Sequence, residues 1–396
     1  MQPTSHHQDI TLKIDIAIAG RISMLRTLLI LTVVFLHTVN EPNIAKVDLS
    51  DFWTVFTCIF QDRLGRFAVP TLTMISAFLL FSSGLDLAPV KLYKKKSMTL
   101  VVPFFFFNML YFAAQYVLEY ATGWSMFYEA THKSHAEFIN ALIAYDNVPF
   151  NGALHFLRDL FVLVLLTPVF GLFLRRAPIV GFALVCAVFL GDLDGHLVNR
   201  DTMAVMFYLG GWAAVGKWEI TRFDRFATPA IVVLIGACTA AVFLRVDNMV
   251  IYLLSPVLVW VAFSHLIGSA LGNWAARNSR YSFFVFLAHT PVLHVLKMLA
   301  AKSPVPVPPL LYSLLATALV AVVLVAAYQS AMKTMPTLFN LMIGARAKGT
   351  VVVERRRRPR PAHAPVYSDA LRLALSGGMA QAEAHGLAGA EGVVRG

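Results

Sequence analysis

The sequence predicts an all-α protein, a polytopic bundle of membrane-spanning helices. Of its 396 residues, 58% are hydrophobic and only 14% are charged, whereas charged residues make up about a quarter of a soluble domain. Apolar runs of about 20 residues, enough to cross a bilayer core of roughly 30 Å as a helix, recur along the chain. Because backbone groups cannot stay unpaired in hydrocarbon, helices are the structure expected for these runs.

About ten apolar segments are predicted to span the membrane, and short polar gaps separate them. The expected spans are residues 22–42, 66–84, 98–118, 155–174, 178–192, 202–216, 227–244, 249–270, 281–300 and 309–332. The fifth and sixth are short for a crossing, which leaves open that one of them is tilted, re-entrant or wrongly bounded. The first twenty residues lack the pattern of a secretory signal, so the first span is expected to be retained.

Lysine and arginine are unevenly distributed between the alternate gaps of this arrangement. One set of gaps holds thirteen: Lys13, Arg21, Lys91, Lys94, Lys95, Lys96, Arg175, Arg176, Lys217, Arg222, Arg225, Arg277 and Arg280. The other set holds six: Lys46, Arg63, Lys133, Arg200, Arg245 and Lys302. Because cytoplasmic loops carry the excess of basic residues, the richer set is predicted to be cytoplasmic. An even number of spans then places both termini in the cytoplasm.

One membrane domain, residues 22–340, is expected between two cytoplasmic segments, residues 1–21 and 341–396. The second segment is rich in Ala, Gly, Arg and Pro without a sustained apolar period, so it is predicted to be a disordered basic tail. The net charge of +11 lies in this tail and in the loops, which is typical of membrane orientation and not of nucleic-acid binding. Cys58, Cys186 and Cys238 form no metal-ligand spacing, and no metal is expected.

Two ionisable residues interrupt the first apolar segment, "MLRTLLILTVVFLHTVN". Arg26 and His37 are eleven positions apart, about three turns plus 20°, so they share one helix face with an axial separation of ~16 Å. In a span of 22–42, Arg26 lies one turn from the cytoplasmic side and His37 in the outer half of the bilayer. Charge at that depth marks a functional candidate. The structural alternatives are a snorkelling arginine and a histidine bonded to a neighbouring helix.

Glu41 follows His37 by four residues and falls on the same face, one turn further out. A carboxylate can orient an imidazole and stabilise its protonated form, as a general base requires. The pair His37 and Glu41 is therefore a candidate catalytic pair. The alternative is that Glu41 is an exposed residue just before Pro42, at the helix end.

Two later spans bring further polar residues to the predicted outer side. His155, Arg158 and Asp159 open the fourth span, where they either face the same outer cavity as His37 or form an Arg–Asp pair at the headgroup boundary. His289 lies in the middle of the ninth span, and Pro291 is expected to kink or loosen the helix beside it. A structural hydrogen bond and a direct catalytic role both remain open for His289.

The spacing of Arg26 and His37 in "RTLLILTVVFLH" is similar to the signature of the acyltransferase 3 family of bacterial membrane proteins. Four further segments resemble the family in the expected order: "VPTLTMISAFLLF" followed by "YKKKSMTLVVPFFFFN", "LHFLRDLFVLVLLTPV", "FYLGGWAAVG" and "SRYSFFVFLAHTPVL". The resemblance covers roughly residues 15–340. Within it, the chain is most similar to glucan succinyltransferases and to the membrane transacylases of cellulose operons.

This resemblance implies O-acylation of a carbohydrate by a multi-pass protein of the bacterial inner membrane. An acyl group, acetyl or succinyl, leaves cytoplasmic acyl-CoA and ends on a sugar hydroxyl outside. By position, His37 corresponds to the essential histidine of the family, and Arg26 to the arginine that meets the donor. The implied partners are membrane lipid, a carbohydrate acceptor, and a polysaccharide synthase or export complex, without nucleic acid.

The chain departs from the family pattern at the second basic motif. Where many members have arginines spaced by two, this loop has Lys94, Lys95 and Lys96. Lysines attract phosphate as point charges but lack the bidentate fork of arginine. Arg63 and Arg66 have the family spacing but lie at the predicted outer end of the second span, where they would instead hold the acceptor or a carboxylated acyl group.

Two other functions are compatible with these residues. In a transporter or flippase, intramembrane His, Arg and Asp would relay protons, although the sequence has no evident internal repeat between its halves. In a purely structural subunit of a secretion complex, His37→Ala would leave function intact.

Overall fold

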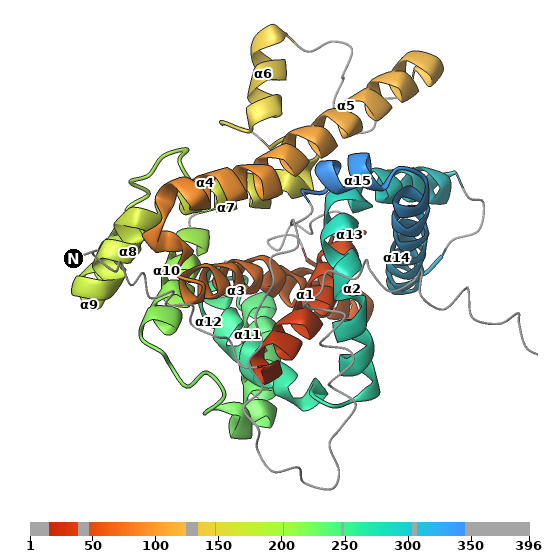
Figure 1. Cartoon of the computed structure of the whole chain (residues 1–396). Coiled ribbons are helices and arrows are strands. Elements are labelled where there is room, and N and C mark those ends of the chain that lie inside the picture. Colours follow the sequence, from red (N-terminus) through yellow and green to blue (C-terminus); the bar gives the residue numbers. More distant parts are fainter. Residues whose placement is uncertain are drawn as a thin grey trace, which may run out of the picture.

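The computed structural model describes residues 16–38, 47–123, 134–146, 148–200, 202–246, 249–302 and 307–344. Every regular element in these ranges is a helix, which confirms the predicted all-α class (Figure 1). The α-helices are α1 Ile16–Leu36, α2 Phe52–Thr57, α3 Ala68–Ser82, α4 Pro89–Lys96, α5 Val102–Thr122, α6 His135–Ile143, α7 His155–Leu165, α8 Thr167–Arg176, α9 Pro178–Leu190, α10 Thr202–Val215, α11 Ala227–Phe243, α12 Met249–Ala262, α13 Ala270–Ala301, α14 Pro309–Thr334 and α15 Pro336–Met342.

Six helical stretches of the described chain are long and apolar enough to cross a membrane. They are Ile16–Leu36, Phe52–Ser82, Pro89–Thr122, Asp224–Phe243, Ala270–Ala301 and Pro309–Thr334. A seventh is the pair Gly152–Leu165 and Thr167–Arg176, bent by 57°, and three shorter apolar helices are Pro178–Leu190, Thr202–Val215 and Ile251–Leu266. Each predicted span coincides with one of these stretches, but ten full crossings stay a prediction because three of the helices are short.

Local sequence signals explain where many of these helices begin. The side chain of Asp51 accepts a hydrogen bond from the backbone of Thr54 (3.0 Å) and caps α2. Ser269 caps α13 in the same way through Gly272 N (3.0 Å). Proline occupies the first turn of α4, α5, α8, α9, α14 and α15, where its missing N–H would be unpaired in any case.

The first helix forms the centre of the bundle. It packs most extensively against α13 and also contacts α3 and α14, while α3 packs against α10. Gly210 permits this second contact, because a Cβ at this position would collide with the backbone carbonyl of Met74. Small residues let helix backbones approach closely in this way. The helices therefore enclose α1, and with it Arg26 and His37.

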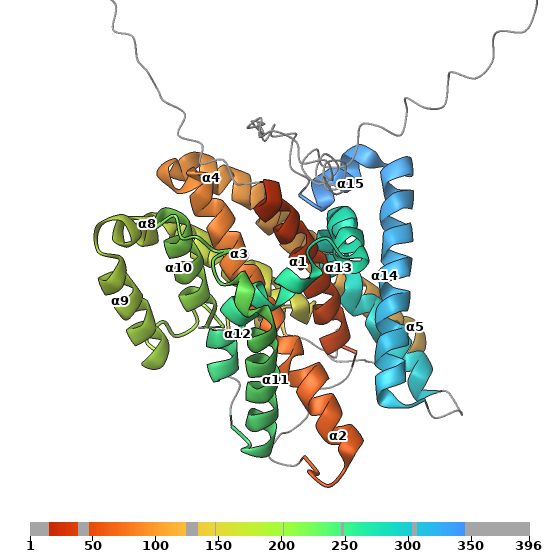
Figure 2. The same ribbon diagram turned by 90° about the horizontal axis from the view of Figure 1, so that it is seen from below.

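The bundle has two distinguishable ends. The start of α1, α4 and α15 gather at one end, whereas α2 lies at the other (Figure 2). Two π-helical turns, η2 Cys58–Arg63 and η5 Ser97–Val101, join α2 and α4 to the helices that follow them. Such turns are rare and are frequent at functional sites. Both lie in the segments for which the sequence predicted acceptor or donor contacts.

Candidate active site

Helix α1 carries the two residues on which the sequence analysis centred. It extends over Ile16–Leu36 and thus begins six residues before the predicted span of 22–42, whose last residues, 39–42, lie outside the described residues. Arg26 is consequently in the middle of the helix, and not one turn from its start. His37 continues the last turn, because its N–H donates to Val33 O (3.1 Å). The shared face and the ~16 Å axial separation are therefore retained.

His289 of α13 is the aromatic neighbour of His37. Their ring centroids are 5.5 Å apart with an interplanar angle of 37°. The His289 side chain is fully buried, and its Nδ1 lies 2.7 Å from Phe286 O. A carbonyl oxygen only accepts hydrogen bonds, so Nδ1 must carry the proton. The other nitrogen, Nε2, has no hydrogen-bond partner among the described residues.

Pro291 changes the backbone hydrogen bonding of α13 near His289. It has no N–H, so the carbonyl of Leu287, four residues earlier, loses its usual helical donor. The side chain of Asn151 donates its Nδ2 to that carbonyl instead (3.1 Å). The expectation that Pro291 loosens the helix near His289 thus has a specific form here, since α13 continues through Pro291 and one freed carbonyl anchors Asn151.

His155, at the start of α7, repeats the geometry of His289. Its Nδ1 lies 2.6 Å from Gly152 O, and its ring is buried. Its Nε2 likewise has no hydrogen-bond partner in the part of the chain that the structure describes. The turn that precedes α7, η7 Gly152–Leu154, packs against α13. The structure therefore brings His155 to the same region as His289 and His37.

Cationic groups flank these imidazoles. Arg200, which is exposed, and Lys297, which is half-buried, both act electrostatically on the His37 ring, as do His155 and His289. Close by on α13, His294 Nδ1 and the hydroxyl of Tyr111 are 2.5 Å apart. From the sequence, Arg200 was placed only in a loop. The nearness of Arg200 and Lys297 to His37 depends on how α7, α13 and the 191–200 segment pack.

Arg158 and Asp159 form the expected pair, with Nη1 and Oδ1 3.0 Å apart. Asp159 is fully buried and accepts backbone hydrogen bonds from Asn199 (3.3 Å) and Arg200 (3.1 Å). Arg158 in turn donates to the carbonyl of His196 (2.7 Å). The pair thereby holds the segment that carries Arg200 next to α7.

Arg63 and Arg66 share one carboxylate. The Asp62 carboxylate is 2.7 Å from Arg66 Nη2 and 3.8 Å from Arg63 Nε, and Arg63 is buried. Next to them, Gln61 donates to Phe35 O (2.8 Å) and to the Thr38 hydroxyl (2.7 Å). Turn η2 is therefore tied to the two residues that bracket His37. Glu41, the other predicted catalytic residue, lies outside the described residues.

Comparison with known proteins identifies the family of the chain. A family model described as an acyltransferase domain, acyltransferase 3, matches residues 20–329. The chain belongs to the acyltransferase 3 family. This confirms the resemblance seen in the sequence and makes the protein an acyltransferase, with several helices apolar enough for a multi-pass membrane protein.

The acyltransferase is also similar to a curated protein, the succinoglycan biosynthesis protein ExoH of Rhizobium meliloti (strain 1021). The two are 27% identical over 350 residues, which cover 84% of this chain and 94% of ExoH. No solved structure matches the chain.

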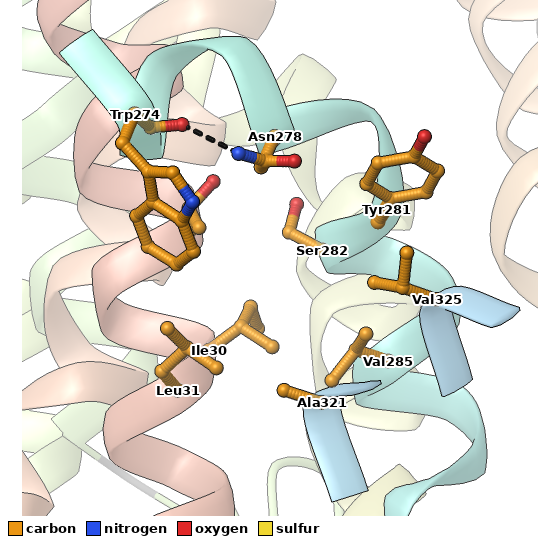
Figure 3. Close-up of a pocket in the computed structure, with 10 residues that line it drawn as sticks. Ile30, Leu31, Trp274, Asn278, Tyr281, Ser282, Val285, Ala321 and Val325 are labelled. Atoms are coloured by element: carbon orange, nitrogen blue, oxygen red, sulfur yellow. Dashed lines mark hydrogen bonds between the residues drawn. The ribbon is translucent and has the colours of Figure 1, made fainter. Parts of the chain in front are cut away.

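A cavity of about 60 Å³ lies between α1, α13 and α14 of the acyltransferase. On α1 the cavity is lined by Thr27, Ile30 and Leu31. These residues follow Arg26 and end about halfway along the helix to His37. Trp274, Asn278 and Tyr281 border one part of the cavity, and Asn278 donates to the Trp274 carbonyl (2.8 Å; Figure 3). The cavity thus lies along α1 between the depths of Arg26 and His37.

The predicted donor lysines are on α4, at the end of the bundle where α1 begins (Figure 2). Lys94 and Lys95 are exposed and Lys96 is half-buried. In the second turn of α1, buried Arg21 forms an ion pair with Asp224 (2.9 Å). Arg21 also donates to Trp260 O and stacks over the Trp260 ring, 4.1 Å from its centroid.

Proposed function

We propose that this chain is a membrane O-acyltransferase that moves an acetyl or succinyl group from cytoplasmic acyl-CoA to a hydroxyl of an envelope or exported polysaccharide such as a glucan or cellulose. The observation that carries the proposal is the contact of the His37 and His289 rings, 5.5 Å apart, at the end of α1. The name of ExoH, a succinoglycan biosynthesis protein, supports a polysaccharide as the acceptor.

On the acceptor side, His37 is the proposed general base. It removes the proton of an acceptor hydroxyl as that oxygen attacks the thioester carbonyl carbon, and the carbon–sulfur bond then breaks. Coenzyme A leaves as a thiolate and takes up the proton that His37 holds. Arg200 and Lys297, whose charges act on His37, are suited to stabilise the oxyanion that forms between these two events. Glu41 is proposed to orient His37.

On the donor side, Arg26 and the lysines of α4 are the proposed contacts of the coenzyme A phosphates. Arginine binds phosphate through two parallel hydrogen bonds, and lysine through its charge. The separation of ~16 Å along α1 is one that the extended pantetheine arm of coenzyme A can bridge. The cavity beside Thr27 and Ile30 borders the inner part of this route.

The proposed topology places ten spans in the bacterial inner membrane with both termini in the cytoplasm. The membrane domain is then residues 22–340, residues 1–21 are a cytoplasmic segment and residues 341–396 a disordered basic tail. The excess of basic residues in one set of loops supports this orientation. Membrane lipid, the carbohydrate acceptor and a polysaccharide synthase or export complex are the proposed partners.

Transfer of a labelled acyl group tests this function. The purified protein in lipid nanodiscs is mixed with radiolabelled acetyl-CoA or succinyl-CoA and a glucan. The radiolabel on the glucan measures transfer, and mass spectrometry of the glucan identifies the ester. We expect label on the glucan with the natural protein and none with His37→Ala at equal membrane abundance. Full transfer by His37→Ala contradicts the mechanism. Movement of the glucan across a bilayer without ester formation would instead favour a transporter.

A further inference from the structure

Three buried acceptor atoms near His37 have no hydrogen-bond donor among the described residues: Asn151 Oδ1, His155 Nε2 and His289 Nε2. The exposed fractions of the three residues are 1%, 7% and 0%. A buried polar atom without a hydrogen-bond partner destabilises the folded protein. Three such atoms in one region, all of the same hydrogen-bonding type, indicate a ligand that supplies donors.

Whether each of these atoms donates or accepts follows from the hydrogen bond that the other polar atom of the same side chain makes. Nδ1 of His155 and Nδ1 of His289 lie against the carbonyls of Gly152 and Phe286. Because both carbonyls only accept, each neutral ring has its proton on Nδ1 and a lone pair on Nε2. Asn151 uses its Nδ2 on Leu287 O, which fixes the amide orientation and leaves Oδ1 as an acceptor.

A hydrogen-bond network orients Asn151. Asn151 N–H donates to Asn108 Oδ1 (3.0 Å), and Asn108 Nδ2 donates to the carbonyl of Ala141 (3.0 Å). Asn108 is itself fully buried. Asn151 is thus held by a connected network that joins α5, α6, the turn before α7 and α13, whereas His155 and His289 are each held by the carbonyl three residues earlier. Such preorganisation is what a binding site requires of residues that support its ligand.

The geometry points to an acceptor subsite in which Asn151, His155 and His289 accept hydrogen bonds from hydroxyl groups of the carbohydrate that are not acylated. This inference rests on the proposed function, because it assigns the reacting hydroxyl to the neighbouring His37. A sugar fits the chemistry, since adjacent ring hydroxyls present several donors at close spacing and carry no charge. Asn151 and His155 are then positioning residues for the acceptor.

The other ligand compatible with two imidazole lone pairs is a transition-metal ion. The described residues contain no group of three or more His, Cys, Asp or Glu side chains that is arranged to hold a metal. The cations Arg200 and Lys297 act on the same region, and they disfavour a further positive charge there. A neutral hydroxyl donor is therefore favoured over a metal ion.

The test measures carbohydrate binding without donor, so that it does not depend on turnover. The full chain in nanodiscs is titrated with radiolabelled cellotetraose and with analogues that each lack one hydroxyl. His155→Phe removes the acceptor nitrogen, His155→Gln keeps an acceptor oxygen, and His196→Phe is a control at an exposed histidine on the same side. Thermal unfolding confirms that each variant is folded.

We expect His155→Phe to weaken binding about three- to tenfold, the range of one neutral hydrogen bond, and His155→Gln to weaken it less. One deoxy analogue should lose a similar factor with the natural protein and no further factor with His155→Phe, which identifies the bonded hydroxyl. His196→Phe should bind like the natural protein.

Equal affinity of the natural protein and His155→Phe for cellotetraose overturns the inference, as does an absence of binding by the natural protein. Tight binding of Zn²⁺ that His155→Phe abolishes also overturns it, because the acceptor atoms would then serve a metal. A separate transfer assay with acyl-CoA distinguishes failure of this inference from failure of the proposed function. Binding with the expected variant pattern but without any ester formation contradicts only the transfer reaction.

Discussion

The rings of His37 and His289 lie 5.5 Å apart although 252 residues separate them in the chain. This contact results from the packing of helix α1 along α13. Close to His289, Pro291 leaves a freed carbonyl in α13 that Asn151 occupies. The proposed base is consequently next to a histidine whose Nε2 has no hydrogen-bond partner among the described residues. Four predictions test the roles that follow from this arrangement.

His37→Ala and Arg26→Ala should impair different steps. Loss of the base should lower kcat by about 10²- to 10⁴-fold, the usual contribution of general base catalysis, with little change in the KM for acyl-CoA. Loss of Arg26 should instead raise that KM, because it removes a contact made with the bound donor. Steady-state kinetics over a range of acyl-CoA concentrations separates the two. The same KM increase in both variants would contradict separate roles.

Pro291→Ala should weaken acceptor use without destabilising the protein. Alanine restores an N–H at position 291, which competes with Asn151 for Leu287 O. Asn151 should then lose its anchor, and the KM for the carbohydrate should rise severalfold while the KM for acyl-CoA stays constant. Kinetics and thermal unfolding together check this. An unchanged acceptor KM would mean that the freed carbonyl has no part in positioning Asn151.

Arg21 and Asp224 should be energetically coupled. Removing one partner of an ion pair with one deeply buried member leaves a poorly solvated charge, so Arg21→Met should destabilise the protein by about 1–3 kcal/mol. The double variant with Asp224→Asn should be destabilised by less than the two single variants together. Denaturation in detergent micelles measures this coupling. Simple additivity would show that the pair does not stabilise the fold.

Replacing Lys94, Lys95 and Lys96 together by glutamine should raise the KM for acyl-CoA. The three lysines are proposed to attract phosphate through their charge, so the natural protein should also lose donor affinity with added salt. The triple variant should show a smaller dependence on salt. Replacement of the same lysines by arginine serves as the matched control and should keep both properties. If the KM for acyl-CoA changes neither in the glutamine variant nor with added salt, α4 is not part of the donor site.

Much of the fold was predictable because its signals are local. The apolar content and the length of the apolar runs gave the all-helical class and the positions of the helical stretches, since an unpaired backbone in hydrocarbon is too costly. The exact bounds of α1 were not predictable. Residues 16–21 contain Arg21, which was counted as a loop residue, and only the tertiary structure pairs its charge with Asp224 within the bundle.

Part of the candidate site was also predictable from the sequence, and part was not. Arg26 and His37 could be singled out from the sequence because eleven positions in a helix place them on one face whatever surrounds them. His289 and the Arg158–Asp159 pair were candidates for a different reason, because they are polar groups in apolar segments. The roles of Asn151, Arg200 and Lys297 could not be predicted, because nothing in their local sequence distinguishes them from ordinary loop or surface residues.

The sequence by itself determined the helical class, the family and the spacing of Arg26 from His37. The helical class follows from composition, the spacing follows from the pitch of one helix, and the family follows from the order of its sequence motifs. Only the tertiary structure decided which other side chains meet at His37 and which of their atoms lack hydrogen-bond donors among the described residues. That decision depends on hydrogen bonds between segments more than one hundred residues apart, such as Asn151 to Leu287, and such pairings are set by packing of the whole bundle.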